Sequence, residues 1–167
     1  GNVDFKVIGS AAGIYDDNVN FSRVMKESDW GARYGLGLKA EYEGKRSYLN
    51  TGGNVRRSDY HSRNDLDNTA ADAFLNFSFD VTDYDHITLD ELFTKKSVPQ
   101  GFLDEFGRVA GRYDNYDNET DLGYSHDYSR QLTGFARYTH GVSKNENPDV
   151  PSSYTNGIGF GSRYSFN

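Results

Sequence analysis

Side chains capable of chemistry are plentiful in this sequence, but their spacing fits no familiar site. The acidic run at 114–121, DNYDNETD, offers hard oxygen ligands of the kind that calcium prefers. The run lacks the spacing and central glycine of a calcium-binding loop, and in a strand its alternate carboxylates would point to opposite faces. We therefore expect these carboxylates to face an interior or a rim, with no metal bound.

Other candidate catalytic patterns fail in the same way. The histidines, His61, His86, His126 and His140, lack the helical spacing of a metalloprotease. The glycine-rich stretch 157–161 has no following helix and no P-loop lysine. No Gly-x-Ser-x-Gly elbow is present, although catalytic residues on the rim of a barrel would need none. We predict that the chain is not an enzyme and uses no cofactor or metal.

Composition and charge exclude several classes of protein. The 167 residues include 13 Tyr, 11 Phe and 18 Gly but no Cys, which favours strands and removes disulfides and thiolate sites. The net charge of -7, with basic residues scattered among acidic ones, argues against a nucleic-acid surface. No run approaches the roughly 20 apolar residues of a spanning helix. A single domain over 1–167 is expected, and it could enter a membrane only as a barrel.

Alternation of apolar and polar residues is the organising signal, and it is typical of strands. The segment 30–42 places Trp, Tyr, Leu and Ala on one face and Gly or charge on the other, and 71–81 and 154–166 repeat the pattern. Weaker strands are expected at 4–16, 46–60, 86–96, 112–126 and 131–143. The sequence therefore predicts an all-β domain of about eight antiparallel strands.

The expected connections alternate between two kinds. Short turns are expected at 43–45, 82–85 and 127–130, and long polar loops at 18–29, 61–69, 97–111 and 144–153. Pro99, Pro148 and Pro151 fall in these loops, where no ladder donor is lost. Short turns at one end and long loops at the other are the layout of a transmembrane β-barrel. Strands of about 11 to 16 residues also suit a tilted membrane crossing better than a globular sheet.

In such a barrel one face of each strand contacts lipid and the other faces the interior. The residues expected to face lipid are Trp30, Tyr34, Leu36, Leu38, Leu75, Phe77, Phe79, Ile158 and Phe160. The residues expected to face the lumen are Arg33, Lys39, Glu41, Arg56, Asp72, Asp80, Arg137 and Arg163. With about eight strands closed alone, side chains fill the interior, whereas further strands would make the lumen a hydrated channel.

Three stretches resemble a known family. They are GIYDDNV at 13–19, TDYDHITL at 82–89 and LGYSHDYSRQL at 122–132. They resemble the outer-membrane β-barrel porin family found with exopolysaccharide and exosortase gene systems. The resemblance covers most of the chain and implies a Gram-negative outer-membrane location and a role as a pore or export conduit. Because members of that family usually carry more strands, two alternatives stay open: the chain is a small barrel by itself, or it is a contiguous segment of a larger barrel.

We therefore expect an antiparallel up-and-down transmembrane β-barrel that acts as a porin or conduit in the bacterial outer membrane, for polysaccharide export or small-solute passage. Its expected partners are membrane lipid, other envelope proteins or further barrel strands, and no nucleic acid. One alternative is a small barrel that anchors an outer-membrane assembly, with the loops 18–29 and 97–111 as contact surfaces. Another is a soluble all-β carbohydrate-binding domain whose aromatic residues stack on sugars.

Overall fold

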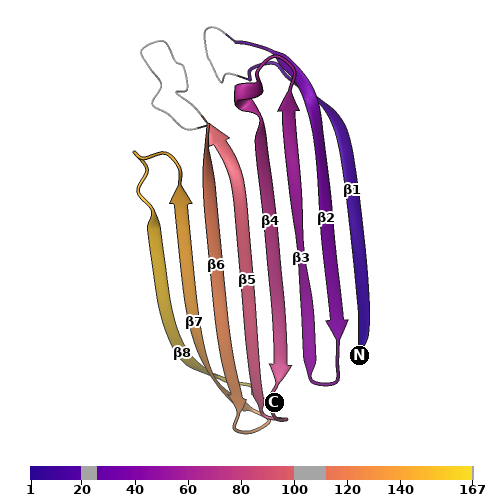
Figure 1. Cartoon of the computed structure of the whole chain (residues 1–167). Coiled ribbons are helices and arrows are strands. Elements are labelled where there is room, and N and C mark those ends of the chain that lie inside the picture. The colour runs from indigo at the N-terminus through magenta and orange to yellow at the C-terminus, as the bar shows by residue number, and fades with distance from the viewer. Residues whose placement is uncertain (20–25, 100–111, 167) are drawn as a thin grey trace.

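The computed structural model describes residues 1–19, 26–99 and 112–166, without the side chains of residues 98, 99 and 112, and it contains one antiparallel sheet. Its eight strands are β1 (Asn2–Asp16), β2 (Asp29–Glu43), β3 (Ser47–Tyr60), β4 (Asn68–Asp80), β5 (Asp85–Pro99), β6 (Arg112–Asp127), β7 (Leu132–Asn145) and β8 (Ser153–Tyr164). A short 3-10 helix, η1 (Asn64–Leu66), lies between β3 and β4. Each strand pairs with the next one in the chain, so the sheet is a simple up-and-down meander (Figure 1).

The predicted all-β, up-and-down arrangement of about eight strands is confirmed. The short turns lie together at one end of the sheet, where β1 begins and β8 ends, and the longer connections lie at the other end (Figure 1). The prediction that Pro99 lies in a loop is wrong, because Pro99 is the last residue of β5 and pairs with Arg112. The ladder between β4 and β5 stops at Lys95, so Pro99 needs no donor toward β4.

The sheet is open rather than closed into a barrel. The strand order places β1 and β8 at its two edges, and no ladder joins them in the described part of the chain. The rows of paired residues nevertheless run obliquely across the strands. The row that starts at Asn2 in β1 reaches Gly159 in β8, which lies five residues before the last residue of that strand, Tyr164. Such a stagger accompanies the strand tilt that a barrel requires.

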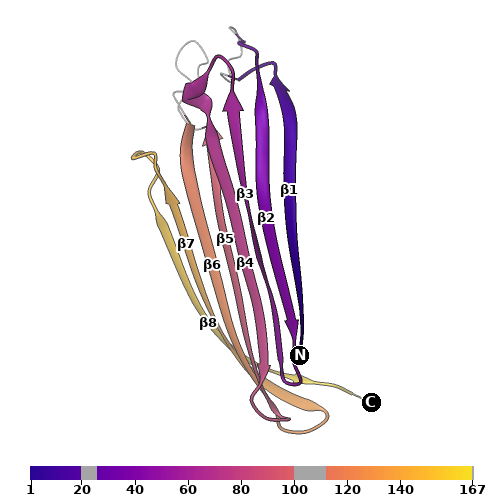
Figure 2. The ribbon, with the colours of Figure 1, turned by 45° about the vertical axis from the view of Figure 1, so that its right-hand side comes forward.

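The sheet is a single layer and has almost no core (Figure 2). Among the described residues, the buried hydrophobic side chains are Val19 and Tyr60, both at the end of the longer connections. At the same end the buried carboxylate of Asp29 accepts backbone N–H groups of Ser62 and Arg63, at 2.9 and 3.0 Å. These contacts tie the start of β2 to the β3–β4 connection. Within the described ranges, no helix is long and apolar enough to cross a membrane.

Two glycines allow aromatic rings to lie across a neighbouring strand. Gly52 of β3 pairs with Phe74 of β4, and a Cβ at Gly52 would lie 2.9 Å from that ring and 2.7 Å from the carbonyl oxygen of Leu38. Gly161 of β8 pairs with Phe135 of β7, and a Cβ there would lie 2.5 Å from the ring. An aromatic side chain over a cross-strand glycine recovers packing that the glycine cannot provide.

This packing predicts unequal effects of two glycine substitutions. Gly52→Ala should lower the free energy of unfolding by about 1–3 kcal/mol, because the carbonyl of Leu38 cannot move without disturbing the ladder. Gly37→Ala is the matched control on the neighbouring strand, since its Cβ would meet no atom closer than 3.7 Å. Urea unfolding followed by tryptophan fluorescence measures both. Equal losses in the two variants would contradict the assigned contacts.

Candidate functional site: the polar face of the sheet

Register divides the strand side chains between two faces, because paired residues of an antiparallel sheet point the same way. The face that contains Leu38 is called the apolar face here, and the one that contains Lys39 is called the polar face. The apolar face carries all nine residues predicted to face lipid: Trp30, Tyr34, Leu36, Leu38, Leu75, Phe77, Phe79, Ile158 and Phe160. The polar face carries all eight predicted to face the lumen: Arg33, Lys39, Glu41, Arg56, Asp72, Asp80, Arg137 and Arg163. What each face contacts stays a prediction.

The apolar face extends over all eight strands and is largely uncovered. The structure describes 25 exposed large hydrophobic residues. Three of them lie on the polar face: Ile8, Leu92 and Phe135. Five lie outside the strands: Val81, Tyr84, Tyr128, Val150 and Phe166. The remaining 17 share the apolar face, with exposed fractions up to 80% at Phe160. Monomeric soluble proteins rarely expose so large an apolar surface, so this face needs a cover.

Side-chain contacts link residues of the polar face, most of them across neighbouring strands and one, between Lys39 and Glu41, within β2. Arg137 of β7 contacts Asp121 of β6 through two nitrogens, Nε and Nη2, each of which lies 2.7 Å from a carboxylate oxygen. Arg56 lies 3.5 Å from Asp72. The other predicted lumen residues with partners pair as follows: Arg33 with Ser58, Lys39 with Glu41, and Asp80 with His86. The fork of Arg137 has the geometry that guanidinium groups prefer toward carboxylates.

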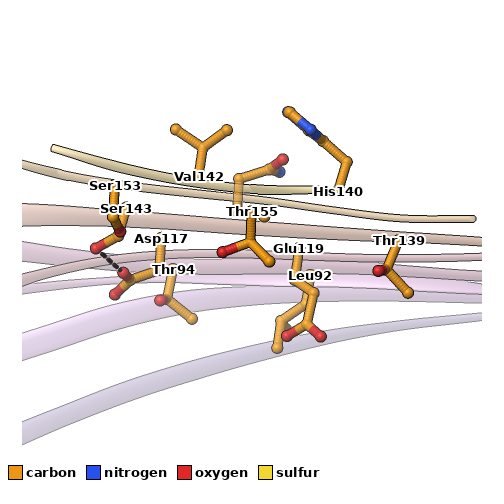
Figure 3. A pocket seen from close by; sticks show the side chains of 12 residues that line it. Leu92, Thr94, Asp117, Glu119, Thr139, His140, Val142, Ser143, Ser153 and Thr155 are labelled. Atoms are coloured by element: carbon orange, nitrogen blue, oxygen red, sulfur yellow. Dashed lines mark hydrogen bonds between the residues drawn. The ribbon is translucent and has the colours of Figure 1, made fainter. Parts of the chain in front are cut away.

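A shallow hollow of about 350 Å³ lies on the polar face over β5 to β8. The polar lining residues whose side chains lie on this face are Thr94, Asp117, Glu119, Thr139, Ser143, Ser153 and Thr155. Figure 3 shows them on one side of the ribbon, with His140 and Val142 pointing to the other side, as the register requires. The Ser143 hydroxyl donates to Asp117 at 2.6 Å. Among the described residues that line the hollow there is no Lys or Arg.

The prediction that the acidic run 114–121 faces an interior or a rim did not separate its two faces, and Asp117, Glu119 and Asp121 are its carboxylates on the polar face. Of these three, Asp121 contacts Arg137, which was predicted to face the lumen. The signal was present, because these carboxylates alternate with Asn118, Thr120 and Leu122 of the apolar face. An acidic run hides that alternation, since both faces carry polar residues there. In this arrangement the polar face presents negative charge and hydroxyl groups to a solute. Within the described residues, no grouping of His, Asp and Glu could hold a metal ion.

A polar row interrupts the apolar face between β5 and β8. Glu91, Thr120, His140 and Asn156 follow one another along the paired strands. The Thr120 hydroxyl donates to Glu91 at 2.5 Å, and Asn118 donates to its other oxygen. The imidazole Nδ1 of His140 lies 2.8 Å from the Asn156 side-chain oxygen. The carboxylate therefore keeps two donors within the sheet, which lowers the cost of placing it away from water.

Ionic contacts also stabilise the longer connections. In the β3–β4 connection, two nitrogens of Arg63 contact the two oxygens of Asp65, at 2.9 and 2.8 Å. These hydrogen bonds are the main reason that the pKa of Asp65 lies below, and the pKa of Arg63 above, its ordinary value. The loops predicted as contact surfaces, 18–29 and 97–111, fall in part outside the described residues.

Comparisons with known proteins identify no relative. A scan against protein-family models, a search of curated proteins and a search of solved structures each gave no match. Function is therefore argued from the chemistry of the two faces.

The contacts of the polar face predict that its arginines contribute unequally to stability. Arg137→Met should lower the urea midpoint of unfolding, because it leaves the half-buried carboxylate of Asp121 without its cation. Arg163→Met is the matched control on the adjacent strand, since the described residues give Arg163 no ion partner. It should leave the midpoint nearly unchanged. A larger loss for Arg163→Met than for Arg137→Met would contradict the pairing.

Proposed function

We propose that this sheet forms the wall, or part of the wall, of an outer-membrane β-barrel conduit. Its apolar face contacts lipid and its polar face lines a water-filled interior. The observation that carries the proposal is that 17 exposed large hydrophobic residues, from seven of the eight strands, share one face, whereas most charged strand residues lie on the other face. The strands have 12 to 16 residues, whereas a tilted membrane crossing needs about 9–11.

Barrel closure follows from the proposal. Unpaired backbone groups in hydrocarbon cost several kcal/mol each, so a sheet with open edges does not persist in lipid. We propose that in the membrane β1 and β8 pair with each other or with further strands. The curvature of the sheet leaves the eight strands open, which favours a barrel of more than eight strands. Such a barrel has a hydrated lumen instead of an interior filled by side chains.

The polar row on the apolar face fits this arrangement. Charged residues on the lipid side of a barrel cost about 2–4 kcal/mol for Arg or Lys at the bilayer midplane, and less for Asp or Glu. Glu91 keeps hydrogen bonds from Asn118 and Thr120. The polar row therefore lowers the hydrophobicity of the apolar face locally and does not prevent the rest of that face from contacting lipid.

The solute of the conduit is proposed from surface chemistry and resemblance together. Hydroxyl and carboxylate groups line the hollow on the polar face, and such groups suit hydrophilic solutes. The resemblance to outer-membrane porins found with exopolysaccharide gene systems favours polysaccharide export, with small-solute passage as the simpler form of the same activity. The exposed apolar face weighs against the soluble carbohydrate-binding alternative, because that domain would leave the face in water.

Two adjacent residues test the assignment of the faces. The chain has no native Cys, so a single introduced thiol reports on its own position. In lipid vesicles a membrane-impermeant maleimide should label Lys39→Cys at least about tenfold faster than Leu38→Cys, because hydrocarbon excludes the reagent and the thiolate.

Labelling of the same two variants after denaturation is the control for thiol reactivity, and it should be equal. Fast labelling of Leu38→Cys in vesicles would contradict the lipid contact. If the protein were also soluble without detergent, that result would favour the carbohydrate-binding alternative.

A further inference from the structure

The strand residues of the polar face carry a surplus of negative charge. Their carboxylates number 12: Asp4, Asp16, Asp29, Glu41, Glu43, Asp72, Asp80, Asp90, Asp117, Glu119, Asp121 and Asp127. Their Lys and Arg residues number seven: Lys6, Arg33, Lys39, Arg56, Lys96, Arg137 and Arg163. The surplus is uneven: β6 carries four of the carboxylates and no cation on this face, whereas β3, β7 and β8 each carry one arginine and no carboxylate.

Three carboxylates over β5 and β6 lie at mid-strand without a direct ion pair, although Arg137 lies near enough to Asp90 and Glu119 to interact with their charges. Asp90 accepts a hydrogen bond from Asn76 at 2.8 Å, and Asp117 accepts from Ser143 at 2.6 Å. These donors are neutral, so they leave the charge in place. Within the described residues, no Lys or Arg nitrogen lies within 4 Å of Asp90, Asp117 or Glu119. Arg137, the cation of the adjacent strand, is engaged with Asp121.

The surroundings of these carboxylates suit a hydrated cation. Asp117 and Glu119 line the hollow of the polar face together with hydroxyls from five Ser and Thr residues. Hydroxyl oxygens can replace water around a cation, and rings of carboxylates are a means by which channels select cations. Lumen walls of one sign of charge raise the local concentration of counter-ions.

We infer that the conduit passes cations in preference to anions, and that Asp90, Asp117 and Glu119 set this preference. The inference rests on the proposed function, since it requires the polar face to line the lumen. The three carboxylates lie on adjacent strands, where Asp90 pairs with Asp121 and Asp117 with Thr94 and Ser143. A potential of this kind extends about one Debye length from the wall, roughly 10 Å at 0.1 M salt and 3 Å at 1 M. Selectivity should therefore be strongest at low ionic strength.

Reversal potentials in planar bilayers test the inference with the purified, detergent-folded protein. Across a KCl gradient of about tenfold at low ionic strength, the permeability of K⁺ over Cl⁻ should be about 3 or more. The triple variant Asp90→Asn, Asp117→Asn, Glu119→Gln should lower this ratio by about twofold or more while channels still form. In 1 M KCl the difference between the two proteins should shrink, because the charges are screened.

Glu91→Gln is the matched control, because it removes one carboxylate from the same strand but from the apolar face. It should leave the ratio unchanged, and heat-modifiable electrophoretic mobility shows whether each variant is folded. Channels that are unselective or favour Cl⁻ would overturn the inference alone. Folded protein that forms no channels would overturn the proposed conduit and the inference with it. An equal loss of selectivity in Glu91→Gln would overturn the assignment of the three carboxylates.

Discussion

The backbone ladder satisfies the polar groups inside this sheet, but nothing in the described chain covers its apolar face. A globular domain gains most of its stability by burying apolar side chains against another layer. Here the described residues include only two buried hydrophobic side chains, Val19 and Tyr60. The dominant favourable term of folding must therefore come from outside the sheet, and under the proposed function a bilayer would supply it without a second layer of protein.

The polar face also has no second layer of protein against it in the described part of the chain. Its charges are arranged between strands, as in the fork of Arg137 on Asp121, so that each strand is held to the next one by more than its ladder. Glycines opposite long side chains let those side chains lie flat, as Phe74 does over Gly52. A wall of this kind keeps its side chains close to the sheet and leaves room for water and solute beyond them.

Alternation was enough to predict the strands and to assign predicted residues to the two faces. Period-two patterning is local, and one face of segments such as 30–42 is so uniformly apolar that no other register is reasonable. Alternation could not show which residues pair across strands. The ion pair of Arg56 with Asp72 therefore became apparent only from the register of β3 and β4 in the structure. In the acidic run at 114–121, alternation could not separate Asp117 and Glu119 from the residues of the opposite face, because polar residues there occupy both faces. The open edges were likewise beyond a sequence pattern, since closure depends on curvature accumulated over many strands.

The single tryptophan offers the most direct test of lipid contact, and it needs no substitution. Trp30, the second residue of β2, lies on the apolar face at the strand end that the longer connections join, and 59% of it is exposed. In vesicles of brominated phospholipids its fluorescence should be quenched, and bromines near the headgroup should quench more than bromines near the chain terminus. Emission that is the same in brominated and ordinary lipids would contradict a membrane-facing apolar surface.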